Sequence, residues 1–160
     1  MRDTHSGCNE WTGLRGACIL LVSREGKVLL NLRSSDPRVM YPGRWAFVSG
    51  GVESEEAPRE AIIRETWEEA HYTLSSPILL WENVHTKPKF EVLDSTFVAP
   101  YDGQTMILGE GEDLGWFSLE EALALNPPEH EVQDLKRFFS KKSLVALVRV
   151  RAMPAPLKTV

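Results

Sequence analysis

Cysteine is scarce in this sequence, which contains only Cys8 and Cys18 among its 160 residues. Cys8 lies in a polar segment and Cys18 lies inside an apolar run, so the pair has no metal-ligand spacing. This argues against a zinc-binding module. We expect both thiols to be reduced.

Positive charge is also in short supply, because 18 Lys and Arg residues stand against 23 Asp and Glu residues and give a net charge of -5. A nucleic-acid surface would require a basic stripe, so no nucleic-acid partner is expected. No apolar run approaches the length of a membrane span, and residues 1–12 lack the apolar centre of a signal peptide. We therefore expect no membrane contact and a cytoplasmic location.

The length suits one folded domain, because a chain of this size can bury most of the surface that unfolding exposes. We interpret residues 1–14 as a flexible N-terminal arm, residues 15–150 as the domain and residues 151–160 as a C-terminal tail. Residues 15–22 (RGACILLV) are typical of a strand buried on both faces, and residues 27–33 (KVLLNLR) are predicted to pair with it as a hairpin.

Strands are predicted on both sides of one long helix. The remaining predicted elements are a strand beginning at Trp45, a helix over about 57–70, strands over 78–84 and 89–99, and helices over 119–125 and 131–141. Residues 144–150 (LVALVRV) are β-rich and are predicted to form an edge strand or part of a homodimer interface, and the sequence does not decide between these. The pattern predicts an α/β sandwich, with a mixed β-sheet flanked by helices.

The stretch from Gly50 to Tyr72 (GGVESEEAPREAIIRETWEEAHY) concentrates negative charge in one loop and one helix. Its glutamates are Glu53, Glu55, Glu56, Glu60, Glu65, Glu68 and Glu69. Like charges at this density destabilise the fold unless something offsets them. Because hard cations such as Mg²⁺ prefer oxygen ligands, we interpret this stretch as a divalent-metal site.

A helical wheel divides the predicted helix into two faces. It places one set of residues toward the core: Ile62, Ile63, Thr66, Trp67 and Ala70. Glu65, Glu68 and Glu69 fall together on the opposite arc, because positions three and four residues apart share a face. The simpler interpretation of such an arc is a solvated acidic face.

The spacing of the charged residues resembles the Nudix box, G-x5-E-x7-R-E-U-x-E-E-x-G-U, in which U is aliphatic. Six of its fixed positions are present: Gly50, Glu56, Arg64, Glu65, Glu68 and Glu69. Three positions depart from it, with Thr66 and Tyr72 at aliphatic positions and His71 at the second glycine. We expect Thr66 to need a hydrogen-bond partner and His71 to change the way the chain leaves the helix. His71 is not expected to be a metal ligand.

The resemblance implies a Nudix-type α/β/α sandwich in which Mg²⁺ or Mn²⁺ is held by Glu56, Glu65, Glu68 and Glu69. It implies that Arg64 orients a box glutamate through a salt bridge. It further implies that a loop glutamate ahead of a W-[FVM]-S segment serves as the general base. Glu110, six residues before Trp116, is the better match to that position, and Glu112 is kept in reserve.

Substrate contacts are expected in and around the proline- and glycine-containing loop of residues 34–44. We name Arg33, Arg44, Trp45, Gly50 and Gly51 as candidate substrate-binding residues, because arginine forks suit phosphate oxygens and the glycines lie in a tight turn. Ordinary surface arginines and a core tryptophan are the alternatives. Ser49 replaces the proline that commonly precedes the two glycines in the family, which is expected to loosen this turn.

By resemblance the chain is a divalent-metal-dependent hydrolase of a pyrophosphate linkage in a nucleoside diphosphate derivative. Its partner would be a small-molecule nucleotide, either a nucleoside triphosphate, an oxidised nucleotide or a nucleotide sugar, and the box does not choose among these. The rival interpretation is a non-catalytic Nudix-fold module that binds a nucleotide as a sensor. Such modules often lack box carboxylates, and this chain keeps them.

Overall fold

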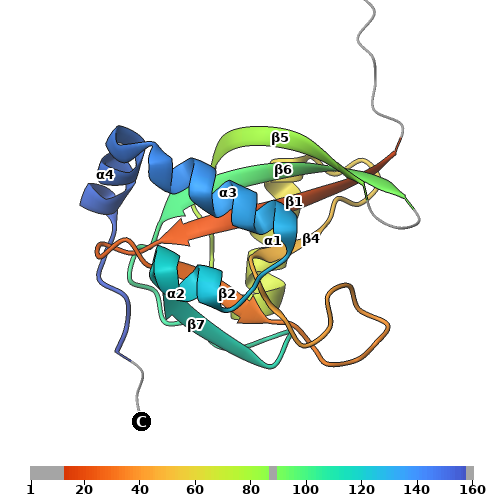
Figure 1. The fold of residues 1–160 in the computed structure, drawn as a ribbon, viewed down its shortest axis with the longest axis horizontal. Helices are drawn as coiled ribbons and strands as arrows, with labels where there is room; N and C mark the ends of the chain where they lie inside the picture. Colours follow the sequence, from red (N-terminus) through yellow and green to blue (C-terminus); the bar gives the residue numbers. More distant parts are fainter. Residues whose placement is uncertain (1–12, 87–89, 158–160) are drawn as a thin grey trace, which may run out of the picture.

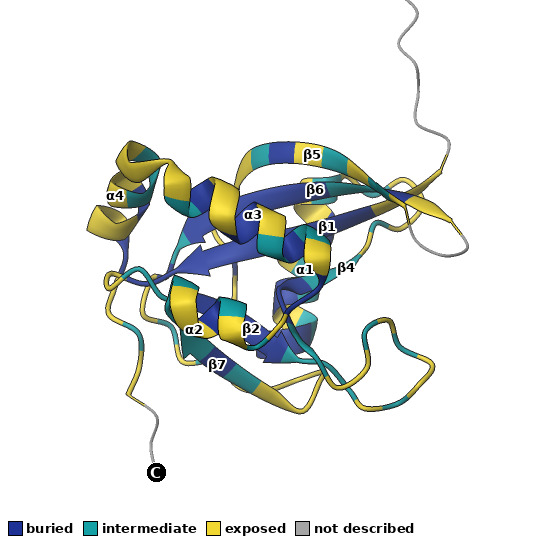
Figure 2. Ribbon diagram, viewed as in Figure 1, coloured by how far each residue is buried: buried dark blue, intermediate teal, exposed yellow. Residues whose placement is uncertain are grey.

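Strand β1 (Leu14–Val22) lies at the centre of the sheet in the computed structural model, which describes residues 13–86 and 90–157. It is buried throughout from Gly16 onward, as the sequence predicted (Figure 2). It runs parallel to β6 (Glu91–Pro100), and the other strand pairs among the described residues are antiparallel. The sheet is therefore mixed.

The predicted hairpin is short, because β2 (Val28–Leu32) pairs with β1 only where Val28 faces Val22. Beyond that point β1 pairs with β4 (Val48–Gly51), while β2 pairs with β3 (Trp45–Ala46). Strand β7 (Asp113–Phe117), which the sequence did not predict, pairs with the other edge of β2. Strand β5 (Ile78–Thr86) pairs with β6 and completes the sheet.

Helices cover both faces of the sheet (Figure 1). Helix α1 (Pro58–Ala70) packs on one face, over Ala17, Ile19 and Leu21 of β1. The opposite face carries Cys18, Leu20 and Val22 of β1 and is covered by α2 (Leu119–Ala124), α3 (Glu129–Ser140) and α4 (Lys142–Arg151). The predicted α/β/α sandwich is confirmed.

The prediction of a strand at residues 144–150 is wrong, because these residues lie in α4. Leu144 and Val148 turn toward the core, whereas Val150 is 74% exposed, and this spacing is helical. The β-branched valines favoured a strand, but tertiary packing here overrides this weak intrinsic strand propensity. The start of the predicted tail is also packed, because Ala152 is buried and the Met153 N–H donates to the Tyr101 carbonyl.

Several boundaries differ from the sequence predictions. Strand β5 extends through His85, which had been placed in a loop, and α3 begins at Glu129 and so includes His130, which had been placed before it. Residues 1–12 of the predicted arm lie outside the described residues. None of the helices in the described part is long and apolar enough to cross a membrane.

Candidate functional site

A short connection joins the second glycine of β4 to helix α1, and this helix carries most of the acidic residues of the box. Pro58 occupies its first turn, and the Glu60 side chain accepts a hydrogen bond from the Ala57 N–H. The helix ends at Ala70, and the C-cap residue His71 takes the left-handed conformation (φ 45°) and donates its N–H to the Trp67 carbonyl. We expected His71 to change the way the chain leaves the helix, and this prediction is wrong. Histidine adopts here the left-handed backbone conformation that glycine favours at this position.

The face of α1 that contacts the sheet is rotated from the one that the helical wheel gave. Trp67, predicted to be in the core, is 52% exposed and packs edge-on against His71. Glu69, predicted to face outward, is only 6% exposed. Thr66 is buried, and its hydroxyl donates to the Ile62 carbonyl at 2.6 Å, which supplies the partner that it was expected to need.

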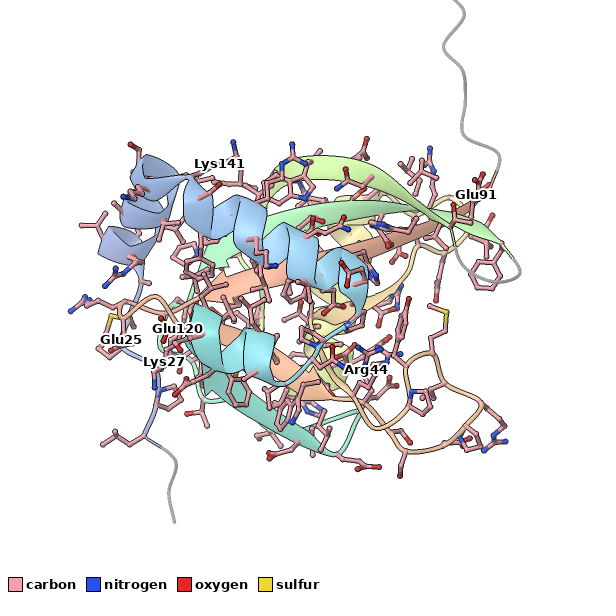
Figure 3. The ribbon with its side chains drawn as sticks, viewed as in Figure 1. Glu25, Lys27, Arg44, Glu91, Glu120 and Lys141 are labelled. Carbon is pink, nitrogen blue, oxygen red and sulfur yellow. The ribbon has the colours of Figure 1, made fainter. Side chains whose placement is uncertain are left out.

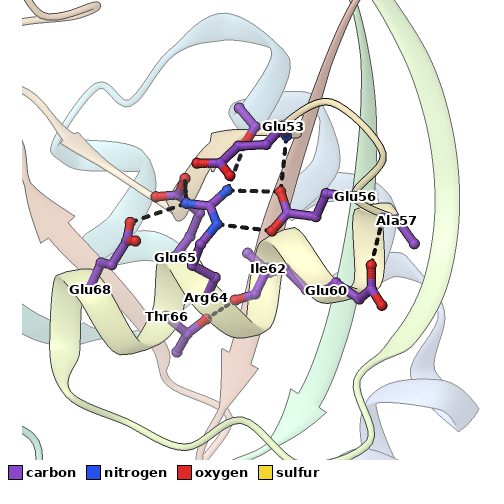
Figure 4. A network of polar contacts seen from close by, with 10 residues as sticks. Glu53, Glu56, Ala57, Glu60, Ile62, Arg64, Glu65, Thr66 and Glu68 are labelled. Carbon is purple, nitrogen blue, oxygen red and sulfur yellow. Dashed lines mark hydrogen bonds and ion pairs between the residues drawn. The ribbon is translucent and has the colours of Figure 1, made fainter.

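Arg64 gathers three box glutamates around one guanidinium (Figure 4). Its Nε lies 2.9 Å from Glu56 Oε1, and its Nη1 lies 2.7 Å from Glu65 Oε1 and 3.1 Å from Glu68 Oε2. Its Nη2 donates to the Gly51 carbonyl. Hydrogen bonding to Arg64 lowers the pKa of Glu56, and the carboxylates raise the pKa of Arg64. We call Glu56, Glu65, Glu68 and Glu69 the acidic cluster. Arg64 positions the first three of these carboxylates and connects them to β4.

The Glu65 carboxylate packs against the sheet at Gly50. A Cβ at this position would overlap the carboxylate of Glu65, whereas a Cβ on Gly51 would meet no atom within 4 Å. The first glycine is thus required by the close approach of a side chain, which only glycine allows. Burial is the largest cause of a raised pKa for Glu65, and it outweighs the opposing contribution of Arg64.

Glu69 is the buried member of the acidic cluster, and hydrogen-bond donors reach both of its oxygens. Asn31 Nδ2 donates to Oε2 at 2.8 Å, and the Ser49 N–H donates to Oε1 at 3.3 Å. Burial raises the pKa of Glu69 to about 8. Ser49 stands where the family commonly has proline, which has no N–H, so this departure supplies a donor to a box glutamate.

Asn31 is a site residue that the sequence reasoning missed. Besides Glu69, its Nδ2 donates to the Glu110 carbonyl at 2.9 Å, so one amide joins the buried glutamate to the loop that carries the candidate base. The Glu110 N–H donates in turn to the Glu68 carbonyl. An asparagine inside an apolar strand (VLLNL) was the available signal, because a buried amide requires partners.

The contacts of Glu110 and Glu112 favour Glu110 as the catalytic candidate. Glu110 lines a small cavity together with Glu69, and its charge raises the pKa of Glu69. The Glu112 carboxylate instead accepts hydrogen bonds from the N–H and hydroxyl of Ser35 on the surface. Glu112 is therefore held by an adjacent loop, away from the acidic cluster.

Replacing Asn31 by alanine is expected to lower turnover roughly ten- to a hundred-fold, the usual effect of removing a group that orients a functional carboxylate. The variant leaves Glu69 Oε2 and the Glu110 carbonyl without their shared donor. Steady-state rates of the purified protein measure the effect. Gln133→Ala, on the exposed surface of α3, is the control, and equal rates in the two variants would contradict a positioning role for Asn31.

Two cavities adjoin the acidic cluster. The larger, of about 470 Å³, contains Gly50 and Gly51 in its wall and extends to Glu131 at the start of α3. The smaller, of about 140 Å³, is lined by Asn31, Glu69 and Glu110 among others. Arg33 and Val39 line both cavities. The predicted residues Arg33, Gly50 and Gly51 are thus brought together along one surface.

Arg44 and Trp45 have partners elsewhere. The Arg44 guanidinium donates to the carbonyls of Asn126 and Pro127, which joins the residue 34–44 loop to the segment between α2 and α3 (Figure 3). The Trp45 ring packs edge-on against Phe117 with 4.9 Å between centroids. Both residues have the contacts of structural residues, and their predicted contact with substrate stays a prediction.

Glu131 is a second buried carboxyl group that the sequence did not single out. It is 3% exposed, and its Oε2 accepts the Phe47 N–H at 2.7 Å. Burial raises its pKa to about 8, from 4.5 for a free side chain. His130, the residue before Glu131, also lines the larger cavity.

The raised pKa of Glu131 predicts a pH-dependent stability. Between about pH 4.5 and pH 8 the unfolded chain loses a proton that the folded chain keeps, so the free energy of unfolding falls as pH rises through this range. Glu131→Gln lacks this titration and is expected to lose less stability than wild type between pH 5 and pH 8. Urea denaturation at both pH values without added metal measures the difference, and parallel losses would contradict burial of an acid.

The acidic cluster offers the donors that a hard cation prefers. Carboxylates of Glu56, Glu65 and Glu68 already converge on one cationic group, Arg64, and Glu69 lies on the same helix. Within residues 13–86 and 90–157 no three acidic, imidazole or thiol side chains are already arranged as ligands of a metal ion. Side-chain rotation away from Arg64 would therefore accompany metal binding. The donor set fits Mg²⁺ or Mn²⁺.

Comparison with known proteins agrees with this architecture. NAD-capped RNA hydrolase NudC from Chromobacterium violaceum is 32% identical over 112 residues, which cover 69% of this chain and 40% of that protein. Diphosphoinositol polyphosphate phosphohydrolase 2 from Homo sapiens is 30% identical over 111 residues, which cover 68% of this chain and 59% of that protein. The chain thus spans roughly half the length of these two relatives.

A solved structure has the same fold. The MutT protein from Methanosarcina mazei Go1 matches with a TM-score of 0.72 and 25% identity, over 81% of this chain and 94% of that chain. The family model described as NUDIX domain matches residues 13–142, which hold the acidic helix, both cavities and the Glu110 loop. The chain therefore belongs to the NUDIX domain family.

Proposed function

We propose that this chain is a divalent-metal-dependent hydrolase that cleaves a pyrophosphate linkage in a nucleoside diphosphate derivative. One observation carries the proposal: the backbone of Gly50 has the Glu65 carboxylate packed against it and also lines the larger cavity. A ligand in the cavity would thus lie next to the acidic cluster. The names of the relatives, a NAD-capped RNA hydrolase and a phosphohydrolase, support the same class of reaction.

Mg²⁺ or Mn²⁺ held by Glu56, Glu65, Glu68 and Glu69 would neutralise the phosphates and lower the pKa of the attacking water. Before metal binds, Arg64 would keep the carboxylates close together, because it contacts three of them. In the reaction a water oxygen bonds to phosphorus, and the bridging P–O bond breaks to release two phosphate products.

Glu110 would accept the proton of the attacking water, with a box glutamate as the alternative acceptor. It shares the smaller cavity with Glu69, and Asn31 holds its backbone beside that glutamate. Arg33 would bind a phosphate, because it lines both cavities and its Nε donates to the Met40 carbonyl, which orients its fork.

Incubation with Mg²⁺ and a panel of nucleoside triphosphates, oxidised nucleotides and nucleotide sugars tests the proposal. We expect one compound to be consumed only when metal is present, with addition of a chelator stopping the reaction. If no compound turns over and one raises the melting temperature, a sensor role replaces the hydrolase. The homodimer and the cytoplasmic location stay predictions.

A further inference from the structure

The loop of residues 102–110, which carries Glu110 at its end, lies across the C-terminal end of α1. Three of its backbone N–H groups donate to the last three carbonyls of the helix, at distances between 2.9 and 3.1 Å, in the pairs Ile107 to Ala70, Gly109 to Glu69 and Glu110 to Glu68. Carbonyls at this end have no partner within the helix, so the loop supplies the donors that they require. The position of Glu110 therefore depends on how firmly the loop is held against α1.

Burial gives this loop little stability of its own. All of its residues lie outside helices and strands, and Ile107 and Leu108 are 63% and 39% exposed. Segments with few buried apolar contacts open locally at a low cost in free energy. Hydrogen bonds from side chains at the end of α1 are accordingly well placed to decide whether the loop stays closed.

His71 provides one such hydrogen bond. Its Nδ1 lies 3.1 Å from the Ile107 carbonyl oxygen, and because a carbonyl only accepts, Nδ1 carries the hydrogen. The Trp67 ring packs edge-on against the imidazole, with 5.2 Å between centroids. A Cβ added to Gly109 would lie 3.1 Å from His71 Cε1 and 2.0 Å from the Glu68 carbonyl oxygen. The loop thus packs closely against both the imidazole and the helix end.

Tyr72 anchors the other end of the loop. Its ring is buried, and its hydroxyl donates to Asp102 Oδ1 at 2.8 Å and accepts the Asp102 N–H at 3.1 Å. The second oxygen of Asp102 accepts from Gln104 Nε2, which also donates to the Thr73 carbonyl. An aliphatic side chain at position 72 could make neither of the two contacts with Asp102.

His71 and Tyr72 are two of the three positions at which this chain departs from the Nudix box. The glycine and the aliphatic residue that the box has there offer no side-chain hydrogen bond. Both departures reach the same loop, across 36 and 30 positions of the sequence. Two departures with one target indicate a shared role in holding that loop.

We propose that His71 and Tyr72 are positioning residues, which hold the loop of residues 102–110 against α1 and thereby fix Glu110 beside Glu69. This inference rests on the proposed function for the role of Glu110 as the proton acceptor. Neither residue touches the substrate, and each acts through the backbone that carries Glu110. Loss of either hydrogen bond should therefore slow the reaction and leave substrate binding nearly unchanged.

His71→Gly removes the imidazole, restores the residue of the box and keeps the left-handed backbone. We expect kcat to fall roughly ten-fold and KM to stay within about three-fold of wild type, because a misplaced group costs turnover more than binding. His71→Asn should restore most of the rate, since asparagine tolerates this conformation and its Nδ2 is attached at the same Cγ as Nδ1 of histidine. Tyr72→Phe, which removes only the hydroxyl, should lower kcat similarly.

A double-mutant cycle shows whether the effect passes through Glu110. His71→Gly should change kcat less than about two-fold in the Glu110→Gln background, where no proton acceptor is left to position. Thr105→Ala, at an exposed position of the same loop, is the control and should match wild type. Wild-type kcat in His71→Gly, equal losses in the two backgrounds, or no rescue by His71→Asn would overturn the inference.

Hydrogen exchange separates this inference from the proposed function. The amides of Ile107, Gly109 and Glu110 should exchange at least about ten-fold faster in His71→Gly than in wild type, whether or not any compound turns over. Unchanged exchange would overturn the inference and leave the hydrolase in place. Faster exchange in a protein that hydrolyses nothing would reject the hydrolase and support the anchoring of the loop by His71.

Discussion

Glu69→Gln is expected to reduce metal-dependent turnover by roughly 10²- to 10⁴-fold, the contribution typical of a carboxylate that handles charge or a proton in the reaction. Glutamine has nearly the same shape, so it fills the buried position beneath Asn31 and Ser49. It lacks the negative charge that a cation requires, and its NH₂ group meets a donor where Glu69 offered an oxygen. The fold should persist, which circular dichroism and thermal melting would show.

Glu120→Gln provides the matched control, because it removes one carboxylate from the exposed first turn of α2. Its turnover should equal that of wild type. Metal titration adds a second readout, since Mg²⁺ should raise the melting temperature of wild type and of Glu120→Gln more than that of Glu69→Gln. Full activity in Glu69→Gln would place the chemistry elsewhere.

Gly50→Ala is expected to lower turnover at least ten-fold and to cost about 1–3 kcal/mol of stability, as overpacking at a tight contact usually does. The added Cβ overlaps the Glu65 carboxylate. Glu65 must then move away from β4, which disturbs its pairing with Arg64. Rates, together with urea denaturation, measure the two effects.

Gly51→Ala isolates the steric part of this effect. The neighbouring position has the same backbone chemistry, and a Cβ there meets no atom within 4 Å. Its free energy of unfolding should match that of wild type within about 0.5 kcal/mol, as at an unconstrained surface site. Equal destabilisation by the two alanines would mean that the contact with Glu65 is not the reason why position 50 requires glycine.

Local spacing was enough to predict the acidic site. The positions of Arg64, Glu56, Glu65 and Glu68 follow from one helix and its entry loop, so a motif of contiguous residues places them together, and the structure brings all four to one point. Arg64 was expected to form a salt bridge with a box glutamate, and this is confirmed. The near-continuous apolar run of residues 15–22 likewise predicted a buried strand, and the order of strands and helices predicted the sandwich.

Contacts between distant segments could not be read from the sequence. A helical wheel gives the angle between the Trp67 and Glu69 side chains, but it does not show which side of the helix faces the sheet. Trp67 was therefore predicted to be buried and Glu69 to be exposed, and both predictions are wrong. Asn31 reaches Glu69 across 38 positions and Glu110 across 79. Glu131 is buried against Phe47, 84 positions away. Such pairings depend on how the strands and helices pack.

The most direct test of the account is whether wild-type protein, Mg²⁺ and Glu69→Gln together define a hydrolysis reaction. The nucleotide panel is incubated with each protein, with and without metal, and the products are resolved by chromatography. The account predicts two phosphate-containing products from one nucleotide, formed by wild type only with metal and nearly absent with Glu69→Gln. Products that form equally without metal, or equally with Glu69→Gln, would contradict it.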